Sequence, residues 1–543
     1  MMRPDLTHAM MPPSMRFARL VCVLSVLVAG LSSRVEADVL SRVLAAADPQ
    51  GGGTAPPQQP PDLSAWAGEA RATTLAELLQ SAVRQSPGLA AARFDIAIAE
   101  ARIQQTWGRN DWLLQAKLDG SYSSNVVSGE GSTIDSQIFL NGSADLTRLL
   151  ATGGSVGIHV GSAYTRLVIP VPDAGDPMTT HNETIKSWTQ QIGASLTQPL
   201  LRGFGRQIYD ANEARATLSR DSAVLGKRLA AIQAVQAVIA AYWDLVLAER
   251  SVAITQASLD LARERLRVTQ IGSDGGKIPR SEIPAVLQII ATREEDVLNG
   301  ELTVLDRSIA LRRASGMPIG AGELGLRVAT DLDTKDEPLE LGKLVERAYT
   351  ASPELAQLAR QDASATIDVL VAENGLLPQL DAALTIGPTG TDTTFGGAWR
   401  DLSDFNALGI NGTLTFSQSL SRDQVRGQVR EQREIKRKLT VNAFDIRAQI
   451  AQTMTRSVAQ LELARRRVVL SQRAIDLANE NIKIETDRFN LGKSTNFDVL
   501  NRQEDLRQAE LRKTQALIDW HKAEIAVQAL TGDILPLYGI KVD

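Results

Sequence analysis

Apolar residues recur every seven positions along two stretches of the chain that contain no proline, 200–278 and 389–535. Each stretch carries two such stripes, offset from one another by two positions. In the first stretch the stripes are Leu245, Val252, Leu259, Leu266 and Leu247, Ile254, Leu261, Val268. In the second they are Met454, Leu461, Val468, Ile475, Ile482, Phe489 and Leu463, Leu470, Leu477, Ile484, Leu491. The heptad spacing predicts very long helices.

Two stripes on one helix imply two neighbours for that helix. Positions two apart point about 200° away from each other, so the stripes lie on opposite sides. A helix from about Arg206 to Gly272 would be on the order of 100 Å long. After Gly492 the same double pattern continues in Ala509, Ala516, Ala523 and Leu511, Ile518, Ile525. We therefore expect a wall of helices packed side by side, with a helical hairpin turning at Gly492.

Elsewhere the hydrophobic period changes from 3.5 to 2, which predicts β-strands with one apolar and one polar face. The alternating runs are 112–122, 138–146, 156–164, 187–200, 376–386 and 410–420. Strands of about 9 to 11 residues with this pattern suit a barrel in an outer membrane. Strand alternation alone leaves a soluble sandwich with one buried face as the alternative.

The chain is one plan written twice. Ser86-Pro87 recurs as Ser352-Pro353, and Gly276-Lys277 recurs as Gly492-Lys493. The expected division is a signal peptide (1–37), a flexible linker (38–72), a first repeat of half-helix, strands, long helix and return helix (73–315), a linker (316–338), a second repeat (339–531) and a C-terminal tail (532–543).

The N-terminus predicts secretion. Arg16 and Arg19 precede an apolar run, 20–31, and small residues ending at Ala37 follow it. This pattern is typical of a cleaved signal peptide. A membrane anchor is the lesser alternative, because a helix needs about 20 residues to span a bilayer and this run is shorter. We see no clean apolar span of the length that a transmembrane helix requires, which favours the barrel over a helical membrane protein.

Composition excludes several classes of protein. Lys and Arg number 58 against 63 Asp and Glu, a net charge of −5, which disfavours nucleic acid as a partner. The lone cysteine, Cys22, and four scattered histidines provide no disulfide framework and no metal site. The glycine-rich stretches ending at Lys277 and Lys493 lack the P-loop spacing. We expect no catalysis and no cofactor.

This organisation resembles the TolC-like outer-membrane efflux channel family. The most specific carriers are the segment from Phe489 to Leu500 and the segment Leu196-Thr-Gln-Pro-Leu200 before a long helix. The resemblance implies an α+β membrane protein: a trimeric outer-membrane β-barrel of twelve strands, in contact with outer-membrane lipid and continuous with a long periplasmic α-helical (coiled-coil) barrel. It also implies an equatorial layer, here the linker 316–338. Its implied partners are a periplasmic adaptor (membrane fusion) protein and an inner-membrane transporter.

Two features depart from that family. The first half holds two additional alternating runs within 135–168, so the barrel is wider than usual or carries an extracellular hairpin. At the periplasmic tip the family often places a Tyr, an Arg and two aspartates. The matching positions here are Phe489, Ser494, Asp498 and Asn501.

Two sets of candidate residues follow. Each glycine turn joins two helical arms and allows a close approach of another backbone, so we expect an adaptor to dock at Gly276, Lys277, Leu491, Gly492 and Lys493. We expect the pore constriction at Asp498, Glu282 and Asn501.

Both acidic candidates have a structural alternative. Thr495 and Asp498 match a capping box, and Glu282 stands in the first turn of a helix, where its charge complements the helix dipole. In a ring, three Asp498 carboxylates would repel, so at least one pKa should rise.

The sequence thus predicts an exit duct for efflux or type I secretion. A trimeric coiled-coil spacer of the cell envelope and a simple porin are the alternatives.

Overall fold

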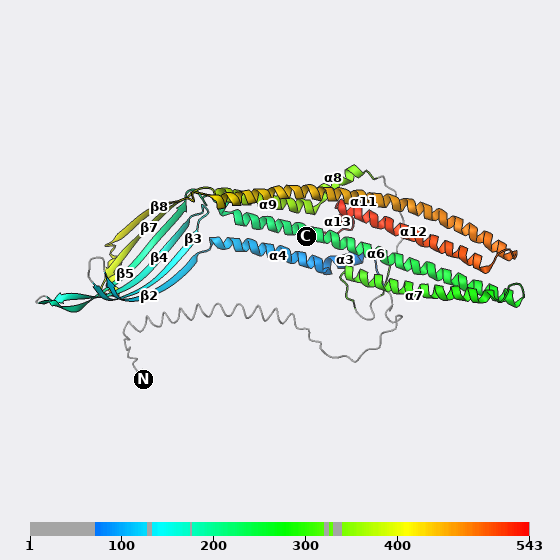
Figure 1. The fold of residues 1–543 in the computed structure, drawn as a ribbon, viewed down its shortest axis with the longest axis horizontal. Coiled ribbons are helices and arrows are strands. Elements are labelled where there is room, and N and C mark those ends of the chain that lie inside the picture. The colour runs from blue at the N-terminus through cyan, green and yellow to red at the C-terminus, as the bar shows by residue number, and fades with distance from the viewer. Residues whose placement is uncertain (1–70, 128–132, 174–175, 320–324, 329–338, 542–543) are drawn as a thin grey trace, which may run out of the picture. The chain divides into compact units, whose positions relative to one another are not determined.

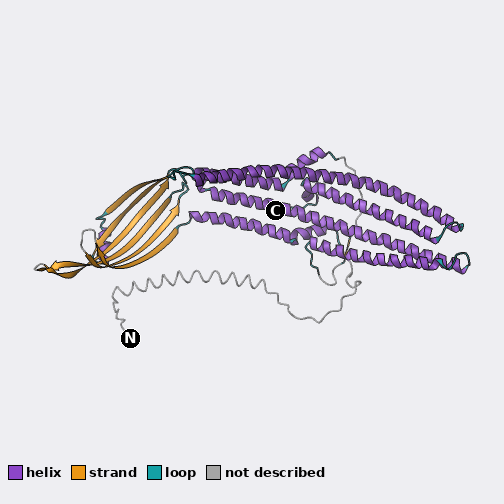
Figure 2. Ribbon diagram, in the orientation of Figure 1, coloured by secondary structure: helices purple, strands orange, loops and turns teal. Residues whose placement is uncertain are grey.

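The computed structural model describes residues 71–127, 133–173, 176–319, 325–328 and 339–541, all within one compact unit. The predicted signal peptide and most of the linker that follows it lie outside the described residues. Figures 1 and 2 show the strands gathered at one end of the long helices.

The helices occur in the same order in both halves of the chain. The first half contains α3 (Leu75–Gln85), α4 (Pro87–Trp107), the 3-10 turn η1 (Gly108–Asn110), α5 (Arg206–Tyr209), α6 (Ala211–Asp274) and α7 (Glu282–Ala314). The second half contains α8 (Leu341–Ala351), α9 (Pro353–Asn374), α10 (Phe395–Ser403), α11 (Asp423–Asn490), α12 (Asn496–Leu530) and α13 (Ile534–Leu537). Pro87 and Pro353 each open a helix, where the missing N–H costs nothing.

Four helices lie side by side at every level of the helical part. Near the strands the order is α4, α6, α9 and α11, and toward the far end it is α7, α6, α12 and α11 (Figure 1). At about 1.5 Å per residue, the 64 residues of α6 span about 96 Å. The predicted length and the predicted side-by-side packing are both confirmed.

The two apolar stripes of α11 differ in burial. Met454 and Leu461 are 0% and 8% exposed, and the other members of their stripe are partly buried. The second stripe, from Leu463 to Leu491, is 50–72% exposed. We call it the Leu463 stripe. The stripes of α12 are both covered, because Ile518 and Ile525 pack against α6 while Ala523 packs against Leu461 of α11.

One sequence-based expectation needs correction. The helix α6 contains an 18-residue window that is apolar and uncharged enough to cross a membrane. Its apolar residues belong to the largest core cluster, where Val235, Val238 and Ile239 are fully buried. This stretch is apolar because α6 packs between neighbours on both sides.

One antiparallel sheet contains all six strands of the alternating runs. The strands are β2 (Leu113–Val127), β3 (Thr133–Leu149), β4 (Ser155–Asp173), β5 (Asp176–Pro199), β7 (Gln379–Asp392) and β8 (Leu408–Ser417), and their order in the sheet is β2-β3-β4-β5-β7-β8. Most of them are longer than the alternating runs predicted. The additional runs form β3 and β4, which pair with each other and with β2 and β5. They are therefore part of the sheet and not an external hairpin.

The two faces of this sheet differ in chemistry. One row across all six strands reads Leu114, Leu146, Ile158, Ala194, Ile386, Ile410. The next row reads Leu113, Thr147, Gly157, Ser195, Thr385, Asn411, and is polar or small on every strand except β2. On the apolar face, Leu114, Leu118, Ile410 and Leu414 are 66–76% exposed. No second sheet packs on that face among the described residues, so the soluble sandwich is wrong.

The sequence did not predict α10. This helix lies on the apolar face, near the outer end of β7 and beside the middle of β5. Gly390 leaves room for it, because a Cβ there would overlap the carbonyl oxygen of Ala398. The rings of Tyr164, Trp188 and Phe395 contact one another there, with centroids 4.7 and 5.1 Å apart.

The two predicted linkers meet. Arg71–Ala72, β1, pairs in parallel with Leu326–Arg327, β6. The end of the first linker is thus tied to the middle of the second, beside the middle of the helical part.

Candidate functional site

The two turns at the far end of the helices have the same backbone geometry. Gly276 and Gly492 adopt φ of 71° and 72°, a left-handed conformation that glycine reaches without strain. In both turns the glycine N–H donates three residues back and the following lysine N–H donates five residues back, to Gly272 O and Arg488 O at 2.8 and 2.9 Å. These are the two bonds of a Schellman motif. Both glycines, both lysines and Leu491 are exposed.

Asp498 caps the helix that follows the second turn. One oxygen of its carboxylate accepts hydrogen bonds from Thr495 N, Thr495 Oγ1 and Ser494 Oγ at 3.1, 2.7 and 3.3 Å. The capping box is complete, as the sequence indicated. The hydrogen bonds from the Thr495 hydroxyl and backbone hold the pKa of Asp498 below its ordinary value. Within one chain the shift is therefore opposite to the rise expected from a ring of three.

Glu282 connects the two hairpins. Its Oε2 accepts hydrogen bonds from Asn496 N and Nδ2 at 3.3 and 2.9 Å, across 214 residues of sequence. A second link lies nearby, where the guanidinium of Arg265 stands 4.9 Å from the ring centre of Phe489. Asn501 lies exposed on α12 and takes no part in these links.

Arg293 is a buried charge that sequence reasoning missed. It lies on α7, 4% exposed, and its Nη1 donates to Ser258 O on α6 at 2.6 Å. Its Nη2 is 3.9 Å from Glu504 of α12. Burial lowers the pKa of Arg293, although an arginine stays charged. A single arginine within an amphipathic helix gives no signal in the sequence, since only the fold shows that its helix face is covered.

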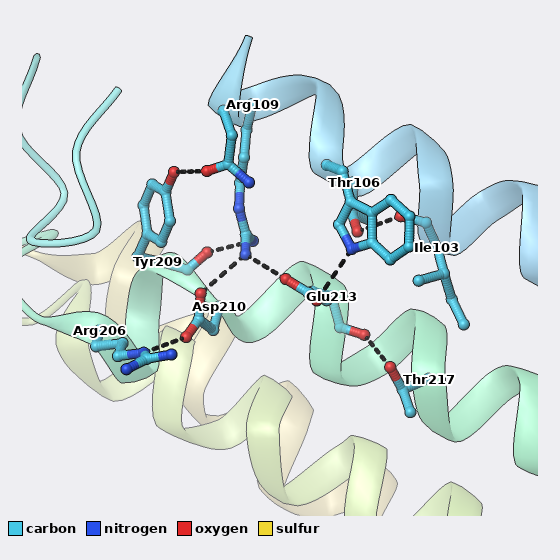
Figure 3. A network of polar contacts seen from close by, with 10 residues as sticks. Ile103, Thr106, Arg109, Arg206, Tyr209, Asp210, Glu213 and Thr217 are labelled. Carbon is cyan, nitrogen blue, oxygen red and sulfur yellow. Dashed lines mark hydrogen bonds and ion pairs between the residues drawn. The ribbon is translucent and has the colours of Figure 1, made fainter. Parts of the chain in front are cut away.

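A second missed cluster joins helices to strands (Figure 3). Arg109, in the turn between α4 and β2, donates to Tyr209 O, Asp210 and Glu213 at 2.6, 2.8 and 2.6 Å. Its guanidinium also lies 4.3 Å from the centre of the Tyr209 ring. Trp107 Nε1 donates to the other oxygen of Glu213 at 3.1 Å. This junction ties the start of the first strand to the start of α6.

Aromatic side chains mark two levels on the apolar face of the sheet. Trp112 and Phe416 lie at the helix end, while Trp188 and Phe395 lie beside the outer end of β7. The distance between the two levels follows from the strand register. Phe416 is paired with Leu380, and Leu380 is paired with Leu200 of the same level. Leu200 is twelve positions from Trp188 along the chain. At about 3.3 Å per residue and a tilt of about 40–45°, the levels are roughly 28–30 Å apart, the thickness of a bilayer core.

The profile of the family described as "Outer membrane efflux protein" matches residues 78–317 and 344–533. The chain belongs to this family. It is located in the outer membrane, with a long helical extension, and takes part in efflux.

Relatives and solved structures agree with this assignment. The outer membrane efflux protein BepC of Brucella suis biovar 1 (strain 1330) is 24% identical over 345 residues, 63% of this chain and 72% of BepC. The pyoverdine export outer membrane protein OpmQ of Pseudomonas aeruginosa is 23% identical over 424 residues, 76% of this chain and 84% of OpmQ.

The solved outer-membrane channels OprN and CmeC, the latter from Campylobacter jejuni, superpose with TM-scores of 0.62 and 0.61 at 13% and 12% identity. They cover 89% of this chain in each case, and 98% and 94% of their own. At such identities the likeness concerns the fold, and it agrees with the TolC-like fold expected from the sequence.

A metal site was sought among the residues of the efflux protein that the structure describes. No cluster of three or more His, Cys, Asp or Glu side chains capable of holding a metal ion occurs there.

Replacing Arg109 with methionine should weaken the junction of this efflux protein. The side chain is 15% exposed, and its carboxylate partners are about one third exposed. We expect a loss of about 2 kcal/mol, since hydrogen bonds to charged groups are the stronger kind. The measurement is the temperature at which the protein unfolds. Arg206→Met is the matched control, because Arg206 contacts the same Asp210 but is 84% exposed. Equal effects of both variants would contradict this role.

Proposed function

We propose that three copies of this chain form the outer-membrane exit duct of a tripartite efflux or type I secretion system. The strands of three copies close into a β-barrel, and their helices close into a periplasmic α-helical barrel. The duct conducts substrates passively to the exterior. A periplasmic adaptor docks on the Gly276 and Gly492 turns, and an inner-membrane transporter supplies the energy.

The proposal rests on the unpaired edges of the sheet and of the helical layer, which lie on the same two sides of the chain. Within the described residues, β2 and β8 each pair with one strand only. In the helical layer α11 forms one edge, while α4 and α7 form the other. The edge helices expose apolar residues: the Leu463 stripe on α11, Phe94 on α4 and Leu298 on α7 are all at least half exposed.

Ring closure would cover all of these groups. In lipid, unpaired strand N–H and C=O groups cost several kcal/mol each. Because the six strands alternate in direction, β8 of one copy meets β2 of the next in antiparallel orientation. The same rotation brings the Leu463 stripe of one copy to α7 of the next, and the half of α11 near the strands to α4.

Two other functions predict different behaviour. A coiled-coil spacer does not require a sheet with one lipid-compatible face, and a porin does not require helices of about 100 Å.

Photocrosslinkers at Lys277 and Lys493 in intact cells test the proposal. Capture of a periplasmic adaptor, together with trimer bands from outer-membrane fractions, is the expected result. Trimers without adaptor capture would favour the porin, and trimers outside the outer membrane would favour the spacer.

At the constriction, Asp498 of three copies should form an acidic ring that favours cations. Asp498→Asn is expected to abolish cation preference in planar-bilayer recordings, because a carboxamide carries no charge and can still accept the capping bond from Thr495. Asn501→Ala is the control, since it removes no charge one turn further on. An unchanged ion preference in the Asp498 variant would leave this residue as a helix cap only.

A further inference from the structure

We infer that the membrane end of the duct is as wide as its helical part and passes bulky hydrophilic solutes. This inference rests on the trimeric duct proposed above. It depends on β3 and β4, the two strands that the first half of the chain has in addition to those matched in the second half.

All six strands reach the helix end of the sheet, with a stagger that increases from β2 to β8. One row of paired residues crosses all six strands. It lies at the first residue of β2, two residues from the helix ends of β3 and β4, four from that of β5 and six from those of β7 and β8. The strands β3 and β4 therefore rise through the membrane together with their neighbours, and a closed barrel has to include them.

The width of the sheet matches the width of the helical layer. Four helices at about 10 Å spacing occupy about 40 Å of circumference per chain. Six strands spaced about 4.8 Å apart and tilted about 40° occupy about 38 Å. Four strands would occupy only about 25 Å. The six-stranded sheet thus continues the helical layer without narrowing.

Closure by three copies gives eighteen strands. The radius of a barrel of n strands is the strand spacing divided by 2·sin(π/n)·cos(tilt). With the spacing and tilt above, the radius is about 18 Å for eighteen strands and about 12 Å for twelve. Subtracting about 5 Å for the lining side chains, half the spacing of packed sheets, leaves free radii of about 13 and about 7 Å.

The lining chemistry fits polar cargo. The polar face carries mostly small side chains. Lys117 pairs there with Asp119 at 3.0 Å, His159 Nδ1 lies 2.6 Å from Asp145 Oδ1, and the carboxylate of Asp381 accepts a hydrogen bond from Gln379. The connection between β7 and β8 does not narrow the mouth through α10, because α10 lies on the opposite, apolar face.

Polymer exclusion tests the width. Polyethylene glycols of graded size are added to the extracellular side of the full-length channel in planar bilayers, and the conductance change reports entry. The matched variant lacks residues 133–173, so that β2 can pair directly with β5, which runs antiparallel to it. We expect the full-length protein to admit polymers of about 10 Å radius and the deletion variant to exclude those above about 7 Å. If the full-length channel showed the narrow cut-off expected of the deletion variant, the inference would be overturned.

Thiol labelling keeps the test decisive if the deletion variant fails to assemble. Cys22 is the only cysteine and lies in the predicted signal peptide, so each cysteine variant carries one thiol after cleavage. Asn141→Cys and Leu140→Cys place it on opposite faces of β3. A water-soluble maleimide should label the first variant and not the second. Labelling of both would place β3 outside the barrel and overturn the inference. A trimer that exports normally but has the narrow cut-off would leave the proposed function standing.

Discussion

Replacing Leu470 and Leu477 together with glutamate should abolish the proposed trimer and, with it, export. Both side chains are 61% exposed in the single chain. Burying a leucine against a neighbour contributes about 1.5–3 kcal/mol, and the double variant removes both leucines from each interface of the ring. A glutamate at either position would also have to lose its hydration without a partner. The measurement is the fraction of heat-modifiable trimer in outer-membrane fractions.

The control for this variant is the replacement of the same leucines with methionine. Leu→Met conserves volume and usually costs less than about 1.5 kcal/mol, so trimers should persist. The helix content of the glutamate variant should also persist, because α11 packs on α12 through the Met454 stripe instead. Normal trimers in the glutamate variant would show that the Leu463 stripe does not face the next copy.

Replacing Gly492 with tryptophan should abolish export and leave the trimer intact. A Cβ at this position would meet no atom within 4 Å, so the turn has room for a side chain in the isolated chain. The bulky indole would instead stand where an adaptor approaches. Export is measured as efflux of a fluorescent substrate from cells.

Gly492→Ala separates bulk from backbone strain. Any residue other than glycine pays about 1–2 kcal/mol for the positive φ of 72°, whatever its size. Alanine has this strain without the bulk, so export should be largely retained. If the tryptophan variant exports as the parent does, Gly492 is not a docking point.

Local patterns in the sequence were enough for the elements and for several of their contacts. The double stripes indicated α6, α11 and α12 as helices with two apolar sides, because heptad spacing records which sides of a helix are apolar. The Thr495 and Asp498 pair indicated the capping box, since both partners lie within one helical turn. The two glycine turns were found because one motif occurs twice.

Contacts between distant segments could not be predicted in this way. Glu282 was expected to complement the helix dipole or line a pore, and it binds Asn496, 214 residues away. Arg109 gave no signal at all, because its partners Asp210 and Glu213 come close only when α4 packs on α6. The helix α10 was missed because its nine residues are too few to show a clear hydrophobic period.

The sequence by itself determined that this protein has long helices, strands with one lipid-compatible face, and two equivalent turns, since each of these is recorded in the spacing of neighbouring residues. Only the tertiary structure decided that β3 and β4 stand inside the sheet and that the Leu463 stripe stays exposed while the Met454 stripe is buried. The physical reason is that alternation and heptads specify which face of an element is apolar. Which neighbour covers that face depends on how all the elements pack at once.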